Sequence, residues 1–382
     1  MEEILYIGIA QTLFSGIIIA LKRPRTIANQ ILAAWLLIIC TEMVIMLVNE
    51  TWFELYPIKF LPFTYGPLLL LYAKWITTEN PKFDLRYLWH FAPFLIFLIL
   101  SLVYINERVM HGTDGFLVID RFVSFRIVYA ITFFISITAY SLSTFVVIHR
   151  HQKRLKEIVS FSSERITLKW LLGLSITFYT GYVVMFIFGG IDIMVGFMPF
   201  DPYEISFISL TLLTFLFGVF GFHQPSIFEE VVWYKGHEDL IELVPDSEPD
   251  SIKYQRSGLK QENVADLVNK IRKYMVIKKP FLDRDLTIYD LSDQLKISRH
   301  TLSEVINEHM GMNFYNLVNE YRVKEVKERM KSDKYRQLTI LAIAYDSGFN
   351  SKSSFNTIFK EKTGQTPSKY LSGLNAKNSG VE

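Results

Sequence analysis

The sequence is poor in cysteine and in charged residues. Cys40 is the only cysteine, so no disulfide can form within the chain and a disulfide-stapled scaffold is excluded. Charged side chains make up 20% of the residues, against roughly 25% in ordinary soluble proteins, and half of all residues are hydrophobic. This composition excludes a disordered chain and is too apolar for an ordinary soluble one.

Motifs of the common enzyme classes are absent as well. The sequence contains no GxxxxGK[ST] phosphate loop, no HExxH or CxxC pattern and no GxSxG nucleophile elbow. We therefore predict no enzyme, no cofactor and no metal site. His149 and His151 flank a basic helix end, and we interpret them as polar residues near a membrane surface rather than as ligands.

The charges that are present lie mostly in the second part of the chain. Residues 1–222 carry 31 charged side chains, and the shorter stretch 223–382 carries 47. The first part contains runs of about 20 apolar residues, the length that an α-helix needs to cross a bilayer. The seven predicted spans are Ile4–Leu21, Ile27–Val48, Phe60–Thr77, Tyr87–Ile105, Phe122–Ile148, Trp170–Ile191 and Ile205–Phe222.

The distribution of Lys and Arg predicts the orientation of these spans. With the N-terminus outside, the inside loops carry eleven Lys and Arg and the outside loops carry three. The inside loops are 22–26, 78–86 and 149–169, and the outside loops are 49–59, 106–121 and 192–204. Because positive charge concentrates on the cytoplasmic side, we expect a multi-pass protein of the cytoplasmic (inner) membrane, with the lipid bilayer as a partner and the residues after Phe222 in the cytoplasm.

The soluble part divides by charge. Residues 223–250 contain one Lys and eight acidic residues, and we interpret 223–260 as an acidic, solvated linker. Residues 251–382 carry 23 basic and 15 acidic side chains, a net charge of +8. We assign 261–372 to a helical domain and 373–382 to a flexible tail. The predicted fold is therefore all-α: a seven-helix transmembrane bundle (1–222) followed by a cytoplasmic helical domain.

The helical domain contains one pattern twice. A short helix, a tight turn and a second helix opened by Ser298 cover 286–311, and the same pattern, opened by Ser351, covers 338–364. Residues Asn313–Met330 have the periodicity of one helix of 18 residues, about 27 Å long at 1.5 Å per residue. Helix–turn–helix units place their second helix in the DNA major groove, and this connector suits two units about one DNA turn, ~34 Å, apart. The alternative is a generic helical bundle.

A long motif lies in the second copy. It comprises Ala344, Gly348-Phe349, Ser351, Phe355, Phe359-Lys360, Gly364, Thr366-Pro367 and Tyr370. This motif resembles the signature of AraC-type transcriptional regulators, and the resemblance covers roughly 263–372, with a looser match in the first copy. The apolar first part does not belong to the signature. It resembles membrane-anchored members of the family in which a multi-spanning sensor precedes the DNA-binding domain.

The resemblance implies sequence-specific binding to double-stranded promoter DNA, with RNA polymerase as a further partner and a homodimer as an assembly that it allows. Carried over by motif alignment, the base contacts come from His300, Ser303 and Glu304 in the first unit and from Lys352, Ser353, Asn356 and Thr357 in the second. Arg299, Lys360 and Lys362 are expected to contact the phosphate backbone. Glu304 departs from the family pattern, which often has a basic residue there.

Charged residues in the predicted spans are candidates for sensing a small-molecule or membrane signal. Glu42 and Arg126 have opposite signs and similar depth, so we expect them to pair, and Asp192 and Glu204 lie at the outer ends of the last two spans. The alternative is that these residues only satisfy one another or the membrane interface.

Together these features predict a membrane-embedded transcription regulator that couples a signal to promoter binding. One alternative is a transporter-like or scaffold membrane protein whose DNA-binding tail is constitutively active. Another, an intramembrane enzyme, would need paired catalytic residues that face each other across the spans, for which only Glu42 and the region of Asp192 and Glu204 qualify.

Overall fold

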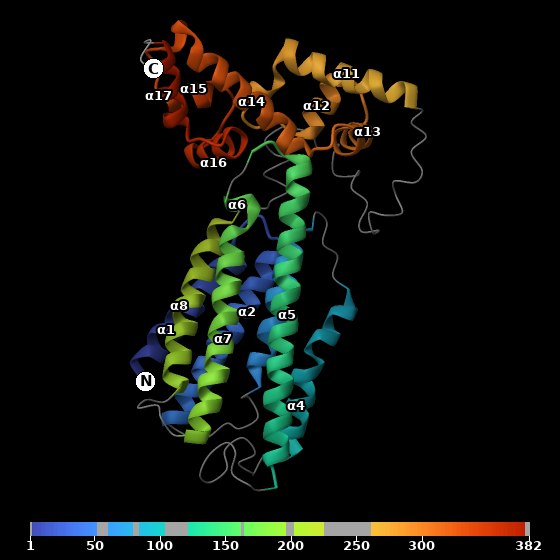
Figure 1. Ribbon diagram of the computed structural model, residues 1–382. Coiled ribbons are helices and arrows are strands. Elements are labelled where there is room, and N and C mark those ends of the chain that lie inside the picture. Colours follow the sequence, from blue (N-terminus) through green and yellow to red (C-terminus); the bar gives the residue numbers. More distant parts are fainter. Residues whose placement is uncertain are drawn as a thin grey trace. The chain divides into compact units, whose positions relative to one another are not determined.

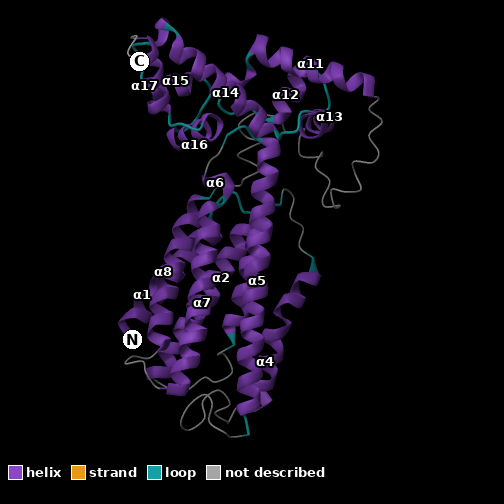
Figure 2. Ribbon diagram, viewed as in Figure 1, coloured by secondary structure: helices purple, strands orange, loops and turns teal. Residues whose placement is uncertain are grey.

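A computed structural model describes residues 2–51, 60–78, 84–103, 121–161, 164–195, 202–224 and 261–378. Over these residues the chain is helical and contains no β-strand, which agrees with the predicted all-α class (Figure 2). The chain forms two units. The bundle unit comprises Met1–Arg150 and Leu168–Leu240, and the C-terminal unit comprises His151–Thr167 and Ile241–Glu382. Most of the predicted linker, 225–260, lies outside the described residues.

Long apolar helices form the bundle unit (Figure 1). Within the described residues, five helices are long and apolar enough to cross a membrane: α1 (Glu2–Leu21), α2 (Ile27–Thr51), α5 (Val123–Ile158), α7 (Lys169–Val195) and α8 (Pro202–His223). Large apolar side chains point outward, as in α1, where Ile7 is 62% exposed and Phe14 is 66% exposed. A helix that is apolar on all faces is typical of a membrane span or a deeply buried core.

The other two predicted spans form shorter helices than expected. The run Phe60–Thr77 contains the 3₁₀ turn η2 (Leu61–Thr64) and α3 (Tyr65–Ile76), and the run Tyr87–Ile105 contains α4 (Ala92–Val103) after the 3₁₀ turn η3 (Leu85–Phe91). Each α-helical part has 12 residues, about 18 Å against the ~30 Å of a bilayer core. Prolines explain the late starts, because proline is tolerated in the first turn of a helix but not in its interior. Pro67 and Pro93 occupy the first turns of α3 and α4.

Small residues let the bundle helices approach one another closely. Gly8, Thr12 and Gly16 lie four residues apart on the buried face of α1. A Cβ atom at Gly8 would lie 2.7 Å from the Sδ of Met43 on α2 and 2.8 Å from the Oγ1 of Thr211 on α8. Close packing at small residues is the usual way in which membrane helices associate.

Short helices form the described part of the C-terminal unit, and α12 to α16 each begin at a side-chain cap. They are α6 (Glu164–Thr167), α11 (Gln261–Lys278), η6 (Pro280–Leu282), α12 (Ile288–Leu295), α13 (Arg299–Glu304), the π turn η7 (Val305–His309), α14 (Phe314–Lys331), η8 (Asp333–Tyr335), α15 (Ile340–Asp346), α16 (Lys352–Thr363) and α17 (Pro367–Asn378). The predicted tail therefore begins within a helix, since α17 extends to Asn378.

Helix α14 contributes to two separate hydrophobic cores. Its first half packs Leu317 and Val318 against α11, α12 and α13, and its second half packs Val323 and Val326 against α15 and α16. Figure 1 shows α14 between the group α11 to α13 and the group α15 to α17. The helix predicted at Asn313–Met330 is thus found one residue further along, and it joins two packed helix pairs.

Candidate nucleic-acid interface

The second helix pair, α15 and α16, is held by caps and a glycine turn. The Thr339 Oγ1 accepts a hydrogen bond from the Ala342 N–H at 3.1 Å, and the Ser351 Oγ accepts one from the Ser354 N–H at 3.2 Å. Gly348 lies between the helices with φ +94°, where a Cβ atom would come within 2.2 Å of the Phe281 carbonyl oxygen. Only glycine fits this turn, because both the backbone conformation and the space exclude a side chain.

The two faces of α16 differ sharply. Phe355, Ile358 and Phe359 are buried in the second core. The predicted base-contact residues are all exposed, namely Lys352, Ser353, Asn356 and Thr357. Their spacing of one, four and five residues places them on one side of the helix. The predicted backbone contacts Lys360 and Lys362 are also exposed, further along the same helix.

The first pair, α12 and α13, has the same local construction. A capping box of Thr287 and Asp290 opens α12, and the Ser298 Oγ accepts a hydrogen bond from the Thr301 N–H at 3.1 Å at the start of α13. The side chain of His300 is exposed and that of Ser303 is half-exposed. Arg299 Nη1 donates to the Tyr289 hydroxyl at 2.9 Å. The guanidinium is therefore tethered near the start of α13.

Glu304 does not belong to the exposed face of α13, contrary to the sequence prediction. It is 5% exposed, and its carboxylate lies 3.8 Å from the Nδ1 of His300. Helix α11 packs against the π turn η7, which begins directly after Glu304. Glu304 therefore does not lie at an exposed position of α13, where the sequence analysis placed it, and its contact with a base stays a prediction.

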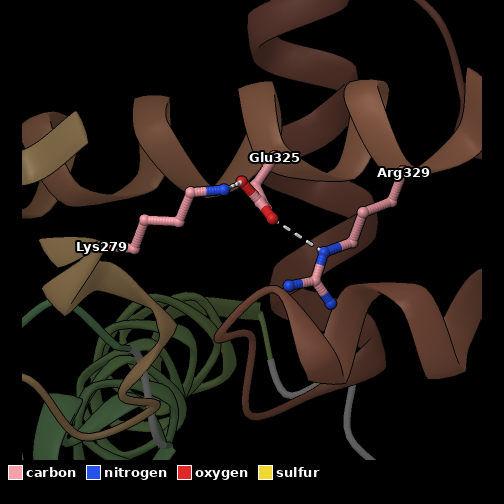
Figure 3. Close-up of polar contacts among 3 residues, drawn as sticks. All are labelled: Lys279, Glu325 and Arg329. Carbon is pink, nitrogen blue, oxygen red and sulfur yellow. Dashed lines mark hydrogen bonds and ion pairs between the residues drawn. The ribbon is translucent and has the colours of Figure 1, made fainter. Parts of the chain in front are cut away.

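A three-residue ion cluster joins the turn after α11 to the connecting helix α14 (Figure 3). Lys279, which follows α11 with φ +47°, places its Nζ 2.7 Å from Glu325 Oε2, and Arg329 Nε lies 2.9 Å from Glu325 Oε1. Burial disfavours ionisation of Glu325, but hydrogen bonds from Lys279 and Arg329 outweigh it and lower its pKa. Both oxygens of the carboxylate are thus held by cations across the joint between α11 and α14.

Arg322 is a buried residue whose importance the sequence prediction missed. It is 1% exposed, and it donates from Nε to the Phe281 carbonyl at 2.8 Å and from Nη2 to the Asp283 carbonyl at 2.6 Å. Burial lowers its pKa to about 10, and the nearby Asp283 opposes that shift. A signal was present in the sequence, because Val318, Arg322 and Val326 recur at intervals of four and so share one face of the helix.

In the bundle unit, the structure gives Glu42 a partner other than the expected one. The Tyr65 hydroxyl, at the start of α3, donates to the Glu42 carboxylate, and among the described residues no ion pair joins Glu42 to Arg126. Tyr65 and Arg126 are both 0% exposed. Asp192 and Glu204 belong to α7 and α8, and their side chains lie outside the described part of the structure. Groups of three or more His, Cys, Asp or Glu able to hold a metal ion are absent from the described residues.

Comparison with known proteins concerns the C-terminal unit. Residues 291–373 match the family described as helix-turn-helix domain. An uncharacterized HTH-type transcriptional regulator of Staphylococcus aureus (strain COL) is 32% identical over 105 residues, which cover 28% of this chain and 13% of that protein. The TCP pilus virulence regulatory protein of Vibrio cholerae is 31% identical over 108 residues, which cover 28% of this chain and 38% of that protein.

One solved structure, that of a protein of unknown function from Listeria innocua, is 26% identical, with a TM-score of 0.24 over 28% of this chain and 94% of that protein. The chain thus spans only a minor part of the length of the curated relatives. The family match covers most of α12, all of α13 to α16 and the first part of α17. Residues 291–373 are a helix-turn-helix domain, similar to those of proteins named as transcriptional regulators.

Proposed function

We propose that the chain is a membrane-embedded, sequence-specific DNA-binding transcription regulator of the AraC type. The observation that carries this proposal is the polar face of α16. It presents Lys352, Ser353, Asn356 and Thr357 to solvent within a segment that matches a helix-turn-helix domain. Lysine can donate to guanine, asparagine can pair with adenine, and serine and threonine accept several bases.

Two DNA-reading units account for the repeated construction. Helices α13 and α16 each open at a capping serine, pack on separate cores, and are joined by α14. The 18 residues of α14 correspond to about 27 Å, which suits two recognition helices in successive turns of one major groove. Of the base contacts predicted on α13, only His300 and Ser303 are exposed or half-exposed, since Glu304 is buried, so we expect α16 to carry most of the sequence preference.

The five long apolar helices support a membrane location for the bundle unit. An odd number of spans places the N-terminus and the C-terminal unit on opposite sides of the membrane. The shorter helices α3 and α4 follow one another in the chain. If neither crosses the membrane, only the loop 78–86 changes side, and all the other loops stay on the side predicted for them. The basic residues of 149–169 therefore keep their cytoplasmic assignment in either count, and a DNA-binding unit belongs there.

Signal reception belongs to the bundle in this proposal. Glu42 joins α2 to α3 through Tyr65, so a ligand that competes for either group would alter how these helices pack. Arg126, Asp192 and Glu204 remain further candidates. A ligand can shift such a bundle only by binding its two states with different affinities. RNA polymerase and a second copy of the chain are also proposed as partners, because the resemblance to AraC-type regulators implies the first and allows the second.

The test uses the full chain in lipid nanodiscs and a pool of random duplexes. Repeated selection should enrich one sequence, and the retained fraction should fall steeply with salt because Lys and Arg displace counterions from DNA. Asn356→Ala or Lys352→Ala should cost about 1–3 kcal/mol at one base pair and relax the preference there. Lys273→Ala, which removes the same charge from an exposed position on α11, is the matched control.

Failure of any duplex to be enriched would refute DNA reading by this chain. If a duplex is enriched but both α16 variants keep the same preference, the recognition surface lies elsewhere. An affinity that does not depend on the state of the bundle, tested with Glu42→Gln and Arg126→Gln, would favour a constitutive DNA-binding tail.

A further inference from the structure

A short segment that follows α5 lies inside the C-terminal unit. Val159 pairs with Thr287 in an isolated antiparallel bridge, and Ser160 is 0% exposed. The base of the loop is closed by hydrogen bonds from α5 to α6. His151 Nε2 lies 2.9 Å from the Ile166 carbonyl oxygen, and Gln152 Nε2 donates to the Thr167 carbonyl at 2.9 Å. This segment comes before the last two predicted spans, more than 100 residues away in sequence from the helices that it contacts.

Each polar group of Ser160 contacts another part of the C-terminal unit. Its N–H and its hydroxyl both donate to the Leu286 carbonyl, at 3.2 Å and 2.7 Å. Its carbonyl accepts from Asn319 Nδ2 at 3.1 Å and from Arg322 Nη1 at 2.8 Å, and its hydroxyl oxygen accepts from Arg322 Nη2 at 3.0 Å. One small residue thus bridges the start of α12 and the middle of α14.

The groove that receives Ser160 is a built polar site. Asn319 and Arg322 are each 1% exposed. A buried guanidinium is costly unless its donors are satisfied, and Ser160 accepts from two of its nitrogens. If the segment withdrew, these donors would need water or another acceptor. Docking of the segment therefore stabilises one of two states of this site, and a signal that favours withdrawal of the segment would shift the balance between them.

The groove also lies where the two helix pairs meet. Arg322 donates to the Phe281 carbonyl ahead of α12, and a Cβ atom at Gly348, in the turn between α15 and α16, would lie 2.9 Å from Arg322 Nε. Any change in the position of Arg322 therefore acts on both pairs. Under the proposed function, the spacing of α13 and α16 decides which DNA the unit fits, and Arg322 contacts the segments that lead into both pairs.

We propose that the Val159–Ser160 segment is an intrachain latch, docked in the groove of Leu286, Asn319 and Arg322, through which the membrane helices control the relative setting of the two DNA-reading pairs. The segment directly follows the last residue of α5, a helix of 36 residues that includes a predicted span. In this proposal a displacement of the end of α5 reaches Ser160 through Val159, the one residue between them. This inference rests on the proposed function, and it names the residue that couples its two parts.

The first arm of the test measures docking without DNA. In a Cys40→Ala background, which removes the only natural cysteine, Ser160→Cys is placed in the full chain in inverted membrane vesicles. A membrane-impermeant maleimide should label the Ser160→Cys variant about tenfold or more slowly than an exposed Lys156→Cys control, since a buried site reacts only on local opening. In denaturant the two rates should become equal. Adding Asn319→Ala should raise labelling at position 160 and leave labelling at position 156 unchanged.

The second arm measures spacing. The sequence enriched by the full chain is presented as a series of duplexes whose two half-sites are separated by different lengths. The natural chain should prefer one spacing by about tenfold or more, as expected when a rigid connector sets the separation. Ser160→Arg, too large for the groove, should flatten this preference to about twofold or less. Ser160→Ala loses only the hydroxyl contacts, so its preference for one spacing should lie between those of the natural chain and Ser160→Arg. Lys156→Ala should show the same preference as the natural chain.

The outcomes separate the two proposals. If the natural chain enriches no duplex, the proposed function fails, whatever the labelling shows. If duplexes are bound but the Ser160→Cys variant is labelled as fast as the Lys156→Cys control, the latch is not docked and the inference is overturned. Slow labelling together with an unchanged spacing preference in Ser160→Arg would also overturn it, because the segment would then only fill space.

Discussion

The bundle unit and the C-terminal unit are both helical, but they position their helices by different means. The long bundle helices, 20 residues in α1 and 36 in α5, approach through small residues such as Gly8. The described helices of the C-terminal unit have at most 18 residues, marginal in length for a helix alone in water. Within that described part, α12 to α16 each begin at a side-chain cap, and buried polar contacts hold the joints. The bundle helices thus approach closely at small residues, whereas the helices of the C-terminal unit also rely on caps and on buried hydrogen bonds.

The largest effect that would sharpen this comparison is expected at Gly348. Gly348→Ala forces a side chain to a φ of +94° and against the Phe281 carbonyl, and it should destabilise the second helix pair by about 3 kcal/mol. Gly181→Ala is the matched control in the bundle, where nothing lies within 4 Å of the added Cβ. It should stay within about 1 kcal/mol.

Hydrogen–deuterium exchange of the full chain in detergent measures both variants by region. Peptides from α15 and α16 should exchange faster in Gly348→Ala, and peptides from α7 should be unaffected by Gly181→Ala. Unchanged protection of α16 in Gly348→Ala would show that the turn tolerates a side chain.

A smaller effect is expected from a single polar pair in the bundle. Tyr65→Phe removes the hydroxyl that donates to Glu42, and it should cost about 2 kcal/mol because a buried acceptor loses its hydrogen-bond partner. Glu42→Gln should cost less, since the amide oxygen still accepts the bond. Tyr6→Phe, at a tyrosine that is 55% exposed on α1, is the control.

Thermal unfolding of the purified chain in detergent, followed by tryptophan fluorescence, measures this change. Four of the six tryptophans, Trp35, Trp75, Trp89 and Trp170, lie in the described part of the bundle unit, and none lies after residue 233, so the signal reports on the bundle rather than on α11 to α17. Equal melting temperatures for Tyr65→Phe and Tyr6→Phe would show that the pair contributes nothing to packing.

The smallest effect is a pH dependence confined to the C-terminal unit. The pKa of Glu325 is lowered from 4.5 in the folded state, so its carboxylate stabilises the fold at pH values above about 4.5, and this contribution is lost as the pH falls through the lowered pKa. Protection of α14 against exchange should therefore decline below that pH. In Glu325→Gln, α14 should be less protected against exchange at neutral pH. Its protection should also fall less as the pH is lowered, because this variant has no carboxylate to protonate at position 325. An identical decline in natural chain and variant would assign the acid sensitivity to other groups.

Much of the local structure was predictable because it depends on neighbours in sequence. The connecting helix was expected at 313–330 and is found at Phe314–Lys331, and the capping roles of Ser298 and Ser351 are confirmed. Apolar periodicity and caps act within one or two helical turns, so they can be read from a short window. The same holds for the apolar runs, although proline shortened α3 and α4 relative to the length of their runs.

Contacts between distant segments could not be predicted in this way. Glu304 is buried although it was expected on an exposed face, and Glu42 accepts a hydrogen bond from Tyr65, at the start of α3, which the sequence analysis did not name as its partner. The exposed face of α16 was expected correctly, but its use for DNA reading remains a prediction.

The sequence by itself determined the all-helical class, the contrast between an apolar first part and a basic helical second part, the caps, and the polar face of α16. Each of these follows from propensity and periodicity over a few residues. Only the tertiary structure decided that Arg322 is buried, that Gly348 contacts it, and that Ser160 docks beside it. The reason is that a buried polar group is defined by its partners, and here those partners come from three segments separated by 26 to 162 residues, which no local pattern can bring together.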